Sequence, residues 1–295
     1  MIRSNSEALS DRAFQVFLSV TLVLICASVV YPLYFVIVAS FSDPDYVING
    51  YVWLYPRKPN VQAYQKVLED EKIWRSYRNT FAYTAVGVLV HLLLILPAAY
   101  ALSRKDFRFR NLFMVYFVIT MFFNGGLIPT YLTILKLGML DSFWVMVLPF
   151  AINVFHIIVA RTFFQQNVPD ELKDAAFMDG CTNLRFFLAV VLPLSKAIIA
   201  VVALFHAVSQ WNQFFLPLIY LKSDVLMPLQ IILRTILIAN LTMDVTDAVH
   251  WGDIMRVGEI LKYALIVVST IPILMVYPFL QKYFSKGVMI GSIKG

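Results

Sequence analysis

The sequence predicts an all-α integral membrane protein with six transmembrane helices, and three observations support this fold class. Of its 295 residues, 60% are hydrophobic and only 14% are charged, whereas soluble domains average about 25% charged residues. The mean hydropathy is +0.75. Six runs contain no Asp, Glu, Lys or Arg, and each approaches or exceeds the roughly 18 residues that cross a bilayer. These runs are 13–42, 79–103, 111–135, 142–160, 197–221 and 263–281.

The distribution of Lys and Arg predicts the orientation of these spans, because cytoplasmic loops carry the excess of cations. Six spans place both termini on one side, together with the loops 104–110 and 161–196. That side holds thirteen cations against seven acids, and the other side holds eleven of each. We therefore expect both termini in the cytoplasm, within a multi-pass protein of the plasma membrane. The net charge of +6 follows from this topology and does not indicate nucleic-acid binding.

The first part of the chain, residues 1–78, is expected to hold a cytoplasmic tail, the first span and an extracytoplasmic segment. Its apolar run is far longer than the 7–15 residues of a signal-peptide core, so we expect it to be retained. In the segment that follows, Pro56 and Pro59 predict a turn, and the pattern over 61–68 predicts a short amphipathic helix. This segment is either a contact site for an external partner or a simple connector.

The next five spans form the expected transmembrane core, residues 79–281. Its second and third spans are joined by a basic loop, and Asn124-Gly125-Gly126 interrupts the third span. Paired glycines at membrane depth indicate either close helix packing or unwound backbone that lines a cavity. Asn124 is therefore a candidate substrate-path residue. The excursion 222–262 is expected outside the membrane.

The fourth span leads into a polar loop, 161–196, in which we expect a short helix to begin near Val168. Asn167 is a candidate cap, and Pro169 suits a first helical turn. Asp170 and Glu171 place negative charge at the positive end of the helix dipole. This helix is about three turns long, which is too short and too charged to cross a bilayer.

The loop helix carries a small shoulder at Ala175 and Ala176, and Gly180 is expected to end it in the left-handed conformation. A second short segment, 182–191, precedes Leu192-Pro193. Asp174-Ala175-Ala176, then Asp179-Gly180, then Val190 and Leu192-Pro193, resemble the EAA loop of permease subunits of ATP-binding-cassette (ABC) importers. Asp174 replaces the glutamate of that pattern, Cys181 its small residue and Val190 its isoleucine, and the spacing is intact.

This resemblance implies a type I ABC importer permease with a cytoplasmic coupling-helix loop that seats in a cleft of an ATPase subunit. The implied partners are a second homologous permease subunit, two ABC ATPase subunits and an extracytoplasmic solute-binding protein. The chain itself would bind no cofactor, and ATP and Mg would lie on the ATPase partners. The residues implied in ATPase coupling are Asp170, Glu171, Asp174, Ala175, Ala176, Asp179, Gly180, Leu192 and Pro193.

The fifth span is unusually polar, since it contains Gln210, Trp211, Asn212 and Gln213. Polar groups at membrane depth are costly unless they face a bundle interior or an aqueous path. Gln210 and Gln213 share a helix face, and Trp211 offers a flat surface of the kind that stacks on a sugar ring. Asn153 and His156 of the fourth span are a matching polar pair. These residues either line a substrate path or join helices by hydrogen bonds.

The sixth span is followed by the cytoplasmic tail, residues 282–295, which ends in Lys294-Gly295. This glycine-containing tail resembles the end of the smaller permease subunit of maltose-type transporters, with Lys286-Gly287 at matching positions. That resemblance implies a carbohydrate substrate, an oligosaccharide above all, whose charge is left open.

Missing motifs bear on the function as well. The sequence contains no phosphate-binding Gly-x-x-x-x-Gly-Lys-Ser/Thr loop and no metal-ligand spacing, so we expect ATP to be hydrolysed by partner subunits. The alternative is an ion-gradient-driven secondary transporter, which would carry ionisable relay residues within its spans. The six runs hold only His91, His156 and His206. An intramembrane enzyme would require a catalytic constellation, which we do not find. The sequence therefore favours an ATP-driven sugar permease.

Overall fold

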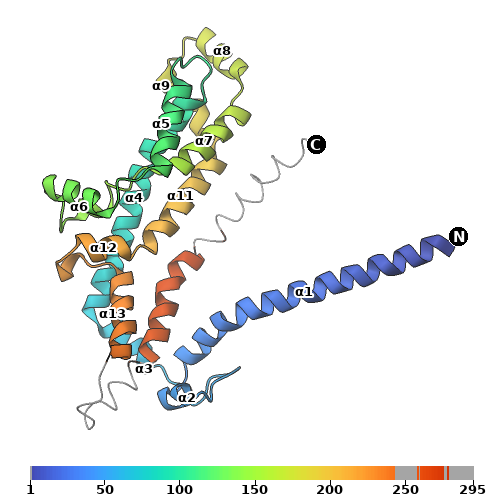
Figure 1. The fold of residues 1–295 in the computed structure, drawn as a ribbon, viewed down its shortest axis with the longest axis vertical. Coiled ribbons are helices and arrows are strands. Elements are labelled where there is room, and N and C mark those ends of the chain that lie inside the picture. Colours follow the sequence, from blue (N-terminus) through green and yellow to red (C-terminus); the bar gives the residue numbers. More distant parts are fainter. Residues whose placement is uncertain (1, 243–257, 259, 276–277, 279–295) are drawn as a thin grey trace. The chain divides into compact units, whose positions relative to one another are not determined.

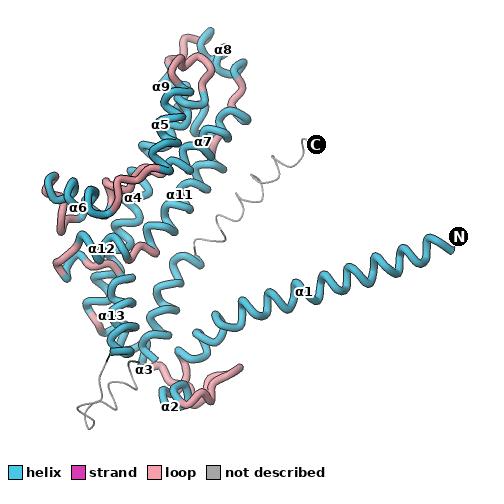
Figure 2. The backbone as a smooth tube through the Cα atoms, viewed as in Figure 1, coloured by secondary structure: helices cyan, strands magenta, loops and turns pink. Residues whose placement is uncertain are grey.

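The computed structural model describes residues 2–242, 258, 260–275 and 278, and every regular element among them is helical (Figure 2). The chain divides into two compact units. The first unit comprises residues 1–70 and 233–270, and the second comprises residues 71–232 and 271–295. The tail 282–295, with the predicted tail contacts at Lys286-Gly287 and Lys294-Gly295, lies outside the described residues.

The first unit begins with α1 (Ile2–Ser40), which is followed by α2 (Pro44–Ile48) and α3 (Gln62–Glu69). Asp43 caps α2 because its Oδ1 accepts a hydrogen bond of 3.0 Å from the Asp45 amide. Tyr64 fastens α3 to the end of α1, since its hydroxyl lies 2.7 Å from Ser40 Oγ and its ring stacks on Phe41. The amphipathic helix predicted over 61–68 is confirmed as α3.

Three helices form the centre of the second unit: α4 (Glu71–Ser103), α7 (Val154–Asn167) and α11 (Lys196–Trp211). α4 packs against both of the others (Figure 1). Their common face holds a buried apolar core, which includes Ile95, Ala99, Ile157, Ala160, Phe164, Ile198 and Val202. Small residues such as Ala99 and Ala160 let the backbones approach closely, as is usual between membrane helices.

The third predicted span is broken as expected. It consists of α5 (Arg110–Phe122) and α6 (Leu127–Lys136), which meet at an angle of 110°. Gly126 stands at the break with a φ of +87°, a backbone conformation that glycine adopts without strain. None of the side chains of α5 is fully buried, although Met114 and Phe117 pack against the core.

The fourth predicted span, 142–160, is not one helix. It contains a short 3-10 turn, η1 (Phe143–Met146), then non-helical backbone, and α7 starts only at Val154. Asn153 sets that start, because its Oδ1 accepts a hydrogen bond of 2.9 Å from the Phe155 amide. The apolar residues 145–147 are buried in a second core cluster with Tyr83 of α4 and Tyr220. The run is thus apolar because it is buried, although only part of it is helical.

The fifth predicted span consists of α11 and α12 (Phe215–Tyr220), separated at 212–214, and η3 (Asp224–Leu226) follows. Apart from the short helices between α7 and α11, the other described helices are α13 (Leu229–Thr242) and Ile260–Met275. Among the described residues, Asp11–Ser40 and Glu71–Ser103 are long and apolar enough to cross a membrane alone. Two bent helix pairs raise this number to four. Six spans therefore remain a prediction.

Candidate functional site

The loop between α7 and α11 forms an elbow, by which we mean residues 168–194. Its first helix, α8 (Asp170–Met178), begins two residues later than predicted. Val168 is non-helical, with φ −120° and ψ 87°, because the residue before a proline is driven out of the α region. Asn167 caps nothing. It is the last residue of α7, and its Nδ2 donates to the Phe163 carbonyl at 2.9 Å.

The end of α8 follows the prediction, because Gly180 has a φ of +76°. Its amide donates to the Phe177 carbonyl at 3.0 Å, and the Cys181 amide donates to the Ala176 carbonyl at 3.0 Å. This pair of bonds is the Schellman motif, which satisfies the last carbonyls of a helix. Gly180 therefore fixes the direction in which the chain leaves α8.

The two faces of α8 have different surroundings. Leu172 and Ala176 pack against the core of the second unit, and Lys173 is buried. Asp174 and Ala175 are exposed. The predicted alanine shoulder is thus divided: Ala176 anchors the helix to its own chain, and Ala175 is free to meet another one.

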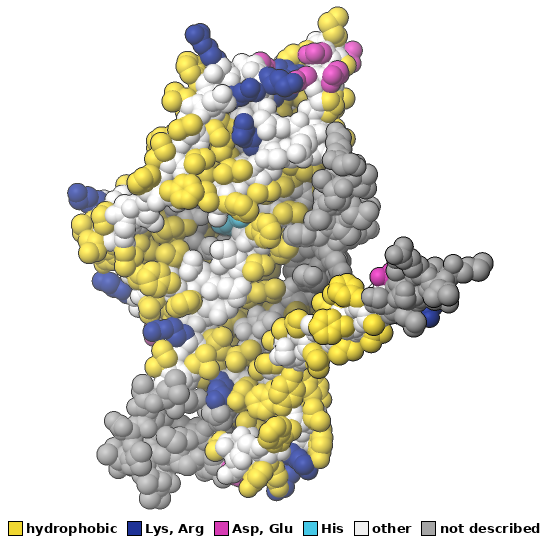
Figure 3. All heavy atoms as spheres, turned by 45° about the vertical axis from the view of Figure 1, so that its right-hand side comes forward, with side chains coloured by type: hydrophobic (Ala, Val, Ile, Leu, Met, Phe, Trp, Pro, Cys, Tyr) yellow, Lys and Arg dark blue, Asp and Glu magenta, His cyan; other side chains and the backbone are white. Residues whose placement is uncertain are grey.

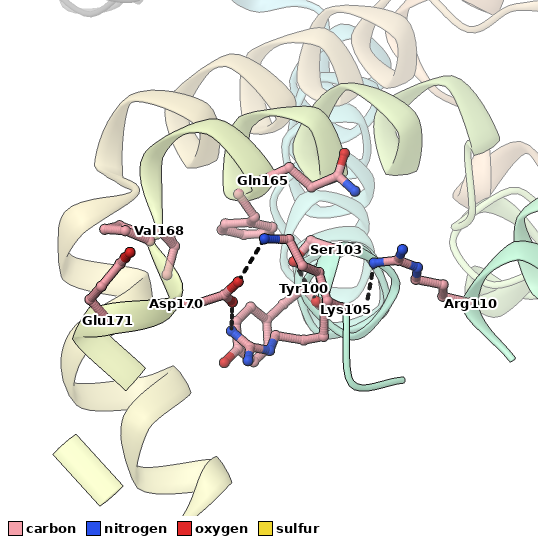
Figure 4. Close-up of a pocket in the computed structure, with 11 residues that line it drawn as sticks. Tyr100, Ser103, Lys105, Arg110, Gln165, Val168, Asp170 and Glu171 are labelled. Carbon is pink, nitrogen blue, oxygen red and sulfur yellow. Dashed lines mark hydrogen bonds and ion pairs between the residues drawn. The ribbon is translucent and has the colours of Figure 1, made fainter. Parts of the chain in front are cut away.

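Ion pairs join α8 to the basic loop that follows α4. Asp170 Oδ2 lies 2.9 Å from Lys105 Nζ, and its Oδ1 lies 3.3 Å from Arg104 Nη1 (Figure 4). Asp106 of the same loop accepts hydrogen bonds from Lys173 Nζ and from Arg104 Nε. In the space-filling view, the acidic and basic side chains gather at the end of the unit where α8 lies (Figure 3).

These contacts shift the titration of both carboxylates in the same direction. The hydrogen bond from Lys173 lowers the pKa of Asp106, and the hydrogen bond from Lys105 lowers the pKa of Asp170. Both carboxylates are therefore ionised at neutral pH. Beside them lies a cavity of about 420 Å³, whose lining includes Glu171 and Arg110. Arg110 Nη1 donates to the Arg104 carbonyl at 3.3 Å.

The second half of the elbow is helical but irregular. Thr182 caps α9 (Asn183–Phe186) through a 3.4 Å hydrogen bond from the Arg185 amide to its Oγ1. A π-helical turn, η2 (Phe187–Val191), and α10 (Leu192–Leu194) complete the segment. Leu192 packs against the core, whereas Pro193 is exposed. The segment 183–194 meets α11 at an angle of 81°.

At membrane depth, three histidines from the three central helices come together, and we call them the histidine cluster. The His91 ring stacks on His206, with centroids 4.0 Å apart and planes 5° apart. His91 Nε2 lies 2.8 Å from His156 Nδ1, and His91 Nδ1 lies 2.5 Å from the Ala151 carbonyl oxygen. All three rings are buried. A hydrogen bond between His91 and His156 therefore joins α4 to α7, and the stacked rings of His91 and His206 join α4 to α11.

The other polar residues of the fifth predicted span occupy different surroundings. Gln210 Nε2 donates to the Met146 carbonyl at 2.7 Å, which ties α11 to η1. Trp211 is buried and meets the Tyr77 ring edge to face at 5.7 Å. Asn212 is exposed and bonds to the Val208 carbonyl of its own helix, and Gln213 is partly exposed.

The remaining substrate-path candidates are Asn124 and Asn153, which are both exposed and serve their own backbone. The Asn124 side chain accepts a 2.8 Å hydrogen bond from the Gly126 amide at the break between α5 and α6, and Asn153 caps α7. The structure thus brings His156 together with two other histidines, whereas Asn124, Asn153 and Asn212 bond to the backbone of their own segments.

The structure adds surface residues that sequence reasoning missed. Met178 at the end of α8 is 88% exposed and Leu184 of α9 is 69% exposed, so the elbow carries an uncovered apolar tip. The exposure of Met178 could have been inferred from its position, because it is an apolar residue directly before the Asp179-Gly180 pair that ends the helix. The partners of the α8 charges, Lys105 and Asp106, lie far away in sequence and could not be paired with α8 from the sequence.

Comparisons with known proteins agree on one family. The family described as binding-protein-dependent transport system inner membrane component matches residues 72–290. The chain is 38% identical to the polygalacturonan/rhamnogalacturonan transport system permease protein YtcP of Bacillus subtilis (strain 168), over 97% of this chain and 100% of that one. It is also 38% identical to the protein LplC of the same strain, over 91% and 90%.

A solved structure is similar as well. It is a bacterial ABC transporter involved in the import of the acidic polysaccharide alginate. The two chains match with a TM-score of 0.86 and 35% sequence identity, over 93% of this chain and 98% of that chain.

Proposed function

We propose that this chain, which belongs to the family of binding-protein-dependent transport system inner membrane components, moves an acidic oligosaccharide into a bacterial cell. It is a permease subunit of an ABC importer and not the ATPase, so ATP is hydrolysed by partner subunits. Membership of this family excludes the ion-gradient-driven alternative. The core predicted for residues 79–281 falls entirely within the matched range of 72–290.

The substrate class rests on one observation about the relatives. YtcP is named for polygalacturonan and rhamnogalacturonan, and the similar solved transporter imports alginate. All three polymers carry uronic acids. Two proteins that each align with more than nine-tenths of this chain are therefore named for acidic polysaccharides. This favours a carboxylated oligosaccharide over a neutral one as the substrate of this chain.

Coupling is assigned to the elbow. We place its exposed face, with Asp174, Ala175 and Met178, against an ATPase subunit. The ion pairs from Lys105 and Lys173 tie α8 to the end of α4, so that movement of the ATPases would move α8 and α4 as one lever and change the access of the substrate path. ATP and Mg lie on the partners, a second permease completes the membrane pathway, and both termini face the cytoplasm.

The substrate proposal is tested by ATPase stimulation and uptake in proteoliposomes, with the cognate binding protein and the ATPase subunits present. The panel contains oligogalacturonides, alginate oligomers and arabino-oligosaccharides. The matched control is the same oligogalacturonide after its carboxyl groups have been reduced to alcohols. We expect stimulation by the acidic oligomers and its loss on reduction. Equal stimulation by the reduced oligomer would refute the acidic substrate while leaving the transporter class intact.

A further inference from the structure

The loop between α2 and α3 displays four large apolar side chains within five residues. Tyr51, Trp53, Leu54 and Tyr55 are each more than half exposed. Single exposed apolar residues are normal on protein surfaces, but a contiguous apolar patch marks a contact with another protein or with a membrane. We call residues 51–58 the aromatic loop.

The aromatic loop has a fixed backbone. The Asp43 amide donates to the Arg57 carbonyl at 3.0 Å, and the Asn60 amide donates to the Phe41 carbonyl at 2.8 Å, which together close the base of the loop. Trp53 Nε1 donates to the Gly50 carbonyl at 2.9 Å. The rings are therefore presented by an ordered scaffold, and the indole N–H needs no outside partner.

One hydrogen bond sets the level of the loop along α1. The Tyr34 hydroxyl donates to the Leu54 carbonyl at 2.5 Å, so the loop runs back beside the helix from which it came (Figure 2). Tyr34 precedes the helix end at Ser40 by six residues, which corresponds to about 9 Å along an α-helix. Leu54 thus lies well back from the end of α1.

The position of the bilayer on α1 can be bounded. The uncharged run 13–42 is longer than the roughly 20 residues that cross the hydrocarbon core. If the first 20 residues of this run fill the hydrocarbon core, Tyr34 lies about 3 Å beyond the outer edge of the core. If the last 20 residues of the run fill it, Tyr34 lies about 12 Å inside that edge. The interfacial layer is about 5–7 Å thick. Both limits place Leu54 at or below the level of the lipid headgroups.

The chemistry of the loop suits that level. Tyr and Trp concentrate at membrane interfaces, where an apolar ring meets a polar layer. The Arg57 guanidinium lies 4.4 Å from the Tyr55 ring centroid, and Lys58 Nζ lies 5.3 Å from that of Tyr46. Cations held beside the rings can reach lipid phosphates while the rings stay in the apolar layer.

We propose that the aromatic loop is an interfacial anchor whose partner is the lipid of the outer leaflet. Its rings enter the boundary between headgroups and acyl chains, and Arg57 and Lys58 bind phosphate oxygens above them. The anchor holds the outer end of α1 at a fixed depth. This inference rests on the proposed function only in that α1 crosses the membrane.

The test uses nitroxide labels on single cysteines in the full transporter, reconstituted in proteoliposomes in a Cys26→Ser and Cys181→Ser background. The labelled variants are Trp53→Cys in the loop, Gln65→Cys on the exposed face of α3 and Ala27→Cys, which lies near the middle of the residues that both limits place in the hydrocarbon core. Accessibility to oxygen, which enters lipid, is compared with accessibility to a water-soluble nickel chelate. We expect oxygen to dominate at positions 53 and 27 and nickel to dominate at position 65.

The possible outcomes separate the two proposals. Nickel dominance at position 53 with oxygen dominance at position 27 would overturn the anchor and leave the membrane topology intact. Nickel dominance at position 27 would instead show that α1 does not cross the bilayer. Protection of position 53 only after binding protein is added would assign the loop to that protein and also overturn the anchor.

A second measurement avoids replacing Trp53 by a label. The fluorescence of the unmodified chain is compared with that of Trp53→Phe, with and without brominated acyl chains in the lipid. We expect the emission that is lost in Trp53→Phe to be blue-shifted and quenched by the brominated lipid. Emission at the wavelength of water-exposed indole without quenching would contradict the anchor.

Discussion

The elbow and the histidine cluster both connect α4 to helices later in the chain, but they do so in opposite surroundings. The elbow is joined through Asp106 and Asp170, whose side chains are 57% and 41% exposed. The histidine cluster is joined by three buried rings at membrane depth. Exposed ion pairs contribute about 0.2–1 kcal/mol each, whereas an unsatisfied polar group in the bilayer costs several kcal/mol.

This difference indicates that the end and the middle of α4 serve different purposes. The end of α4 near Ser103 holds the elbow by contacts that are individually weak and directional, next to an apolar tip that no part of the described chain covers. The middle of α4 holds α7 and α11 by contacts that cannot be opened without exposing polar groups to lipid. The elbow is therefore suited to meet another chain, and the histidine cluster is suited to keep this one together.

The largest expected effect tests whether the tip of the elbow is a docking surface. Met178→Asp removes an apolar side chain whose burial in an interface contributes about 1.5–3 kcal/mol, and each 1.4 kcal/mol is tenfold in affinity. We expect the ATPase subunits to bind at least tenfold more weakly, as measured by titration of the detergent-solubilised permease pair. Met178→Leu is the matched control and should bind normally. Normal binding by Met178→Asp would place the docking surface elsewhere.

The second prediction concerns the direction of the chain after α8. A Cβ on Gly180 would meet no atom within 4 Å, so any effect of substitution comes from its φ of +76°. Valine resists that conformation at a cost of about 1–3 kcal/mol. We expect Gly180→Val to hydrolyse ATP without moving sugar, measured as the ratio of uptake to ATP hydrolysis. Asn tolerates left-handed backbone, so Gly180→Asn should keep the ratio, and a shared loss in both variants would disprove this explanation.

The third prediction is smaller and concerns the contacts at membrane depth. Gln210→Leu removes the hydrogen bond to the Met146 carbonyl, which is worth about 0.5–1.5 kcal/mol. We expect a lower melting temperature of the purified permease, with transport per folded molecule unchanged. Exposed Gln213→Leu serves as a control that should leave the melting temperature unaltered. If Gln210→Leu instead lost transport at an unchanged melting temperature, Gln210 would belong to the substrate path.

The smallest expected effect concerns the ion pairs of α8. Because the pKa of Asp106 is lowered in the folded chain, its ionised carboxylate stabilises the fold fully above the ordinary pKa of aspartate, about 3.9. This stabilisation is lost as the pH falls through the lower pKa of the folded state. Between pH 6 and 8 we therefore expect no change in the hydrogen-exchange protection of α8. Asp106→Asn should reduce that protection by about 0.2–1 kcal/mol. High salt should reduce it more in the unmodified chain than in Asp106→Asn, which keeps only the ion pairs of Asp170.

The elbow could be predicted from the sequence because its determinants are local. Thr182 accepts from the Arg185 amide and the Gly180 amide donates to the Phe177 carbonyl, so both act within three residues of themselves and their roles are readable without a fold. Asn167 was misread because two local rules compete, and the restriction that Pro169 places on Val168 excludes the helical start that a cap at Asn167 would need. The difference between Ala175 and Ala176 depends on which face of α8 meets the core.

The contacts at membrane depth could not be predicted in the same way. His91 is separated from His156 by 65 residues and from His206 by 115, and nothing local relates the three. The sequence predicts one helix over 142–160, but an uncharged apolar stretch indicates burial without specifying the shape of the backbone. The cap at Asn153 and the packing of residues 145–147 against Tyr83 determine where the helix begins.

The π-helical turn η2 gives the elbow an unusual relation between chain length and direction. A π-turn contains one residue more than the α-turn it replaces, so removing one residue from 187–191 would leave a continuous α-helix. The wider π-turn absorbs its extra residue locally, so such a deletion would leave the direction of the chain after it nearly unchanged. Pro193 and α10 would keep their place relative to α9. The elbow can therefore gain or lose a single codon here while the surface it presents to an ATPase stays aimed as before.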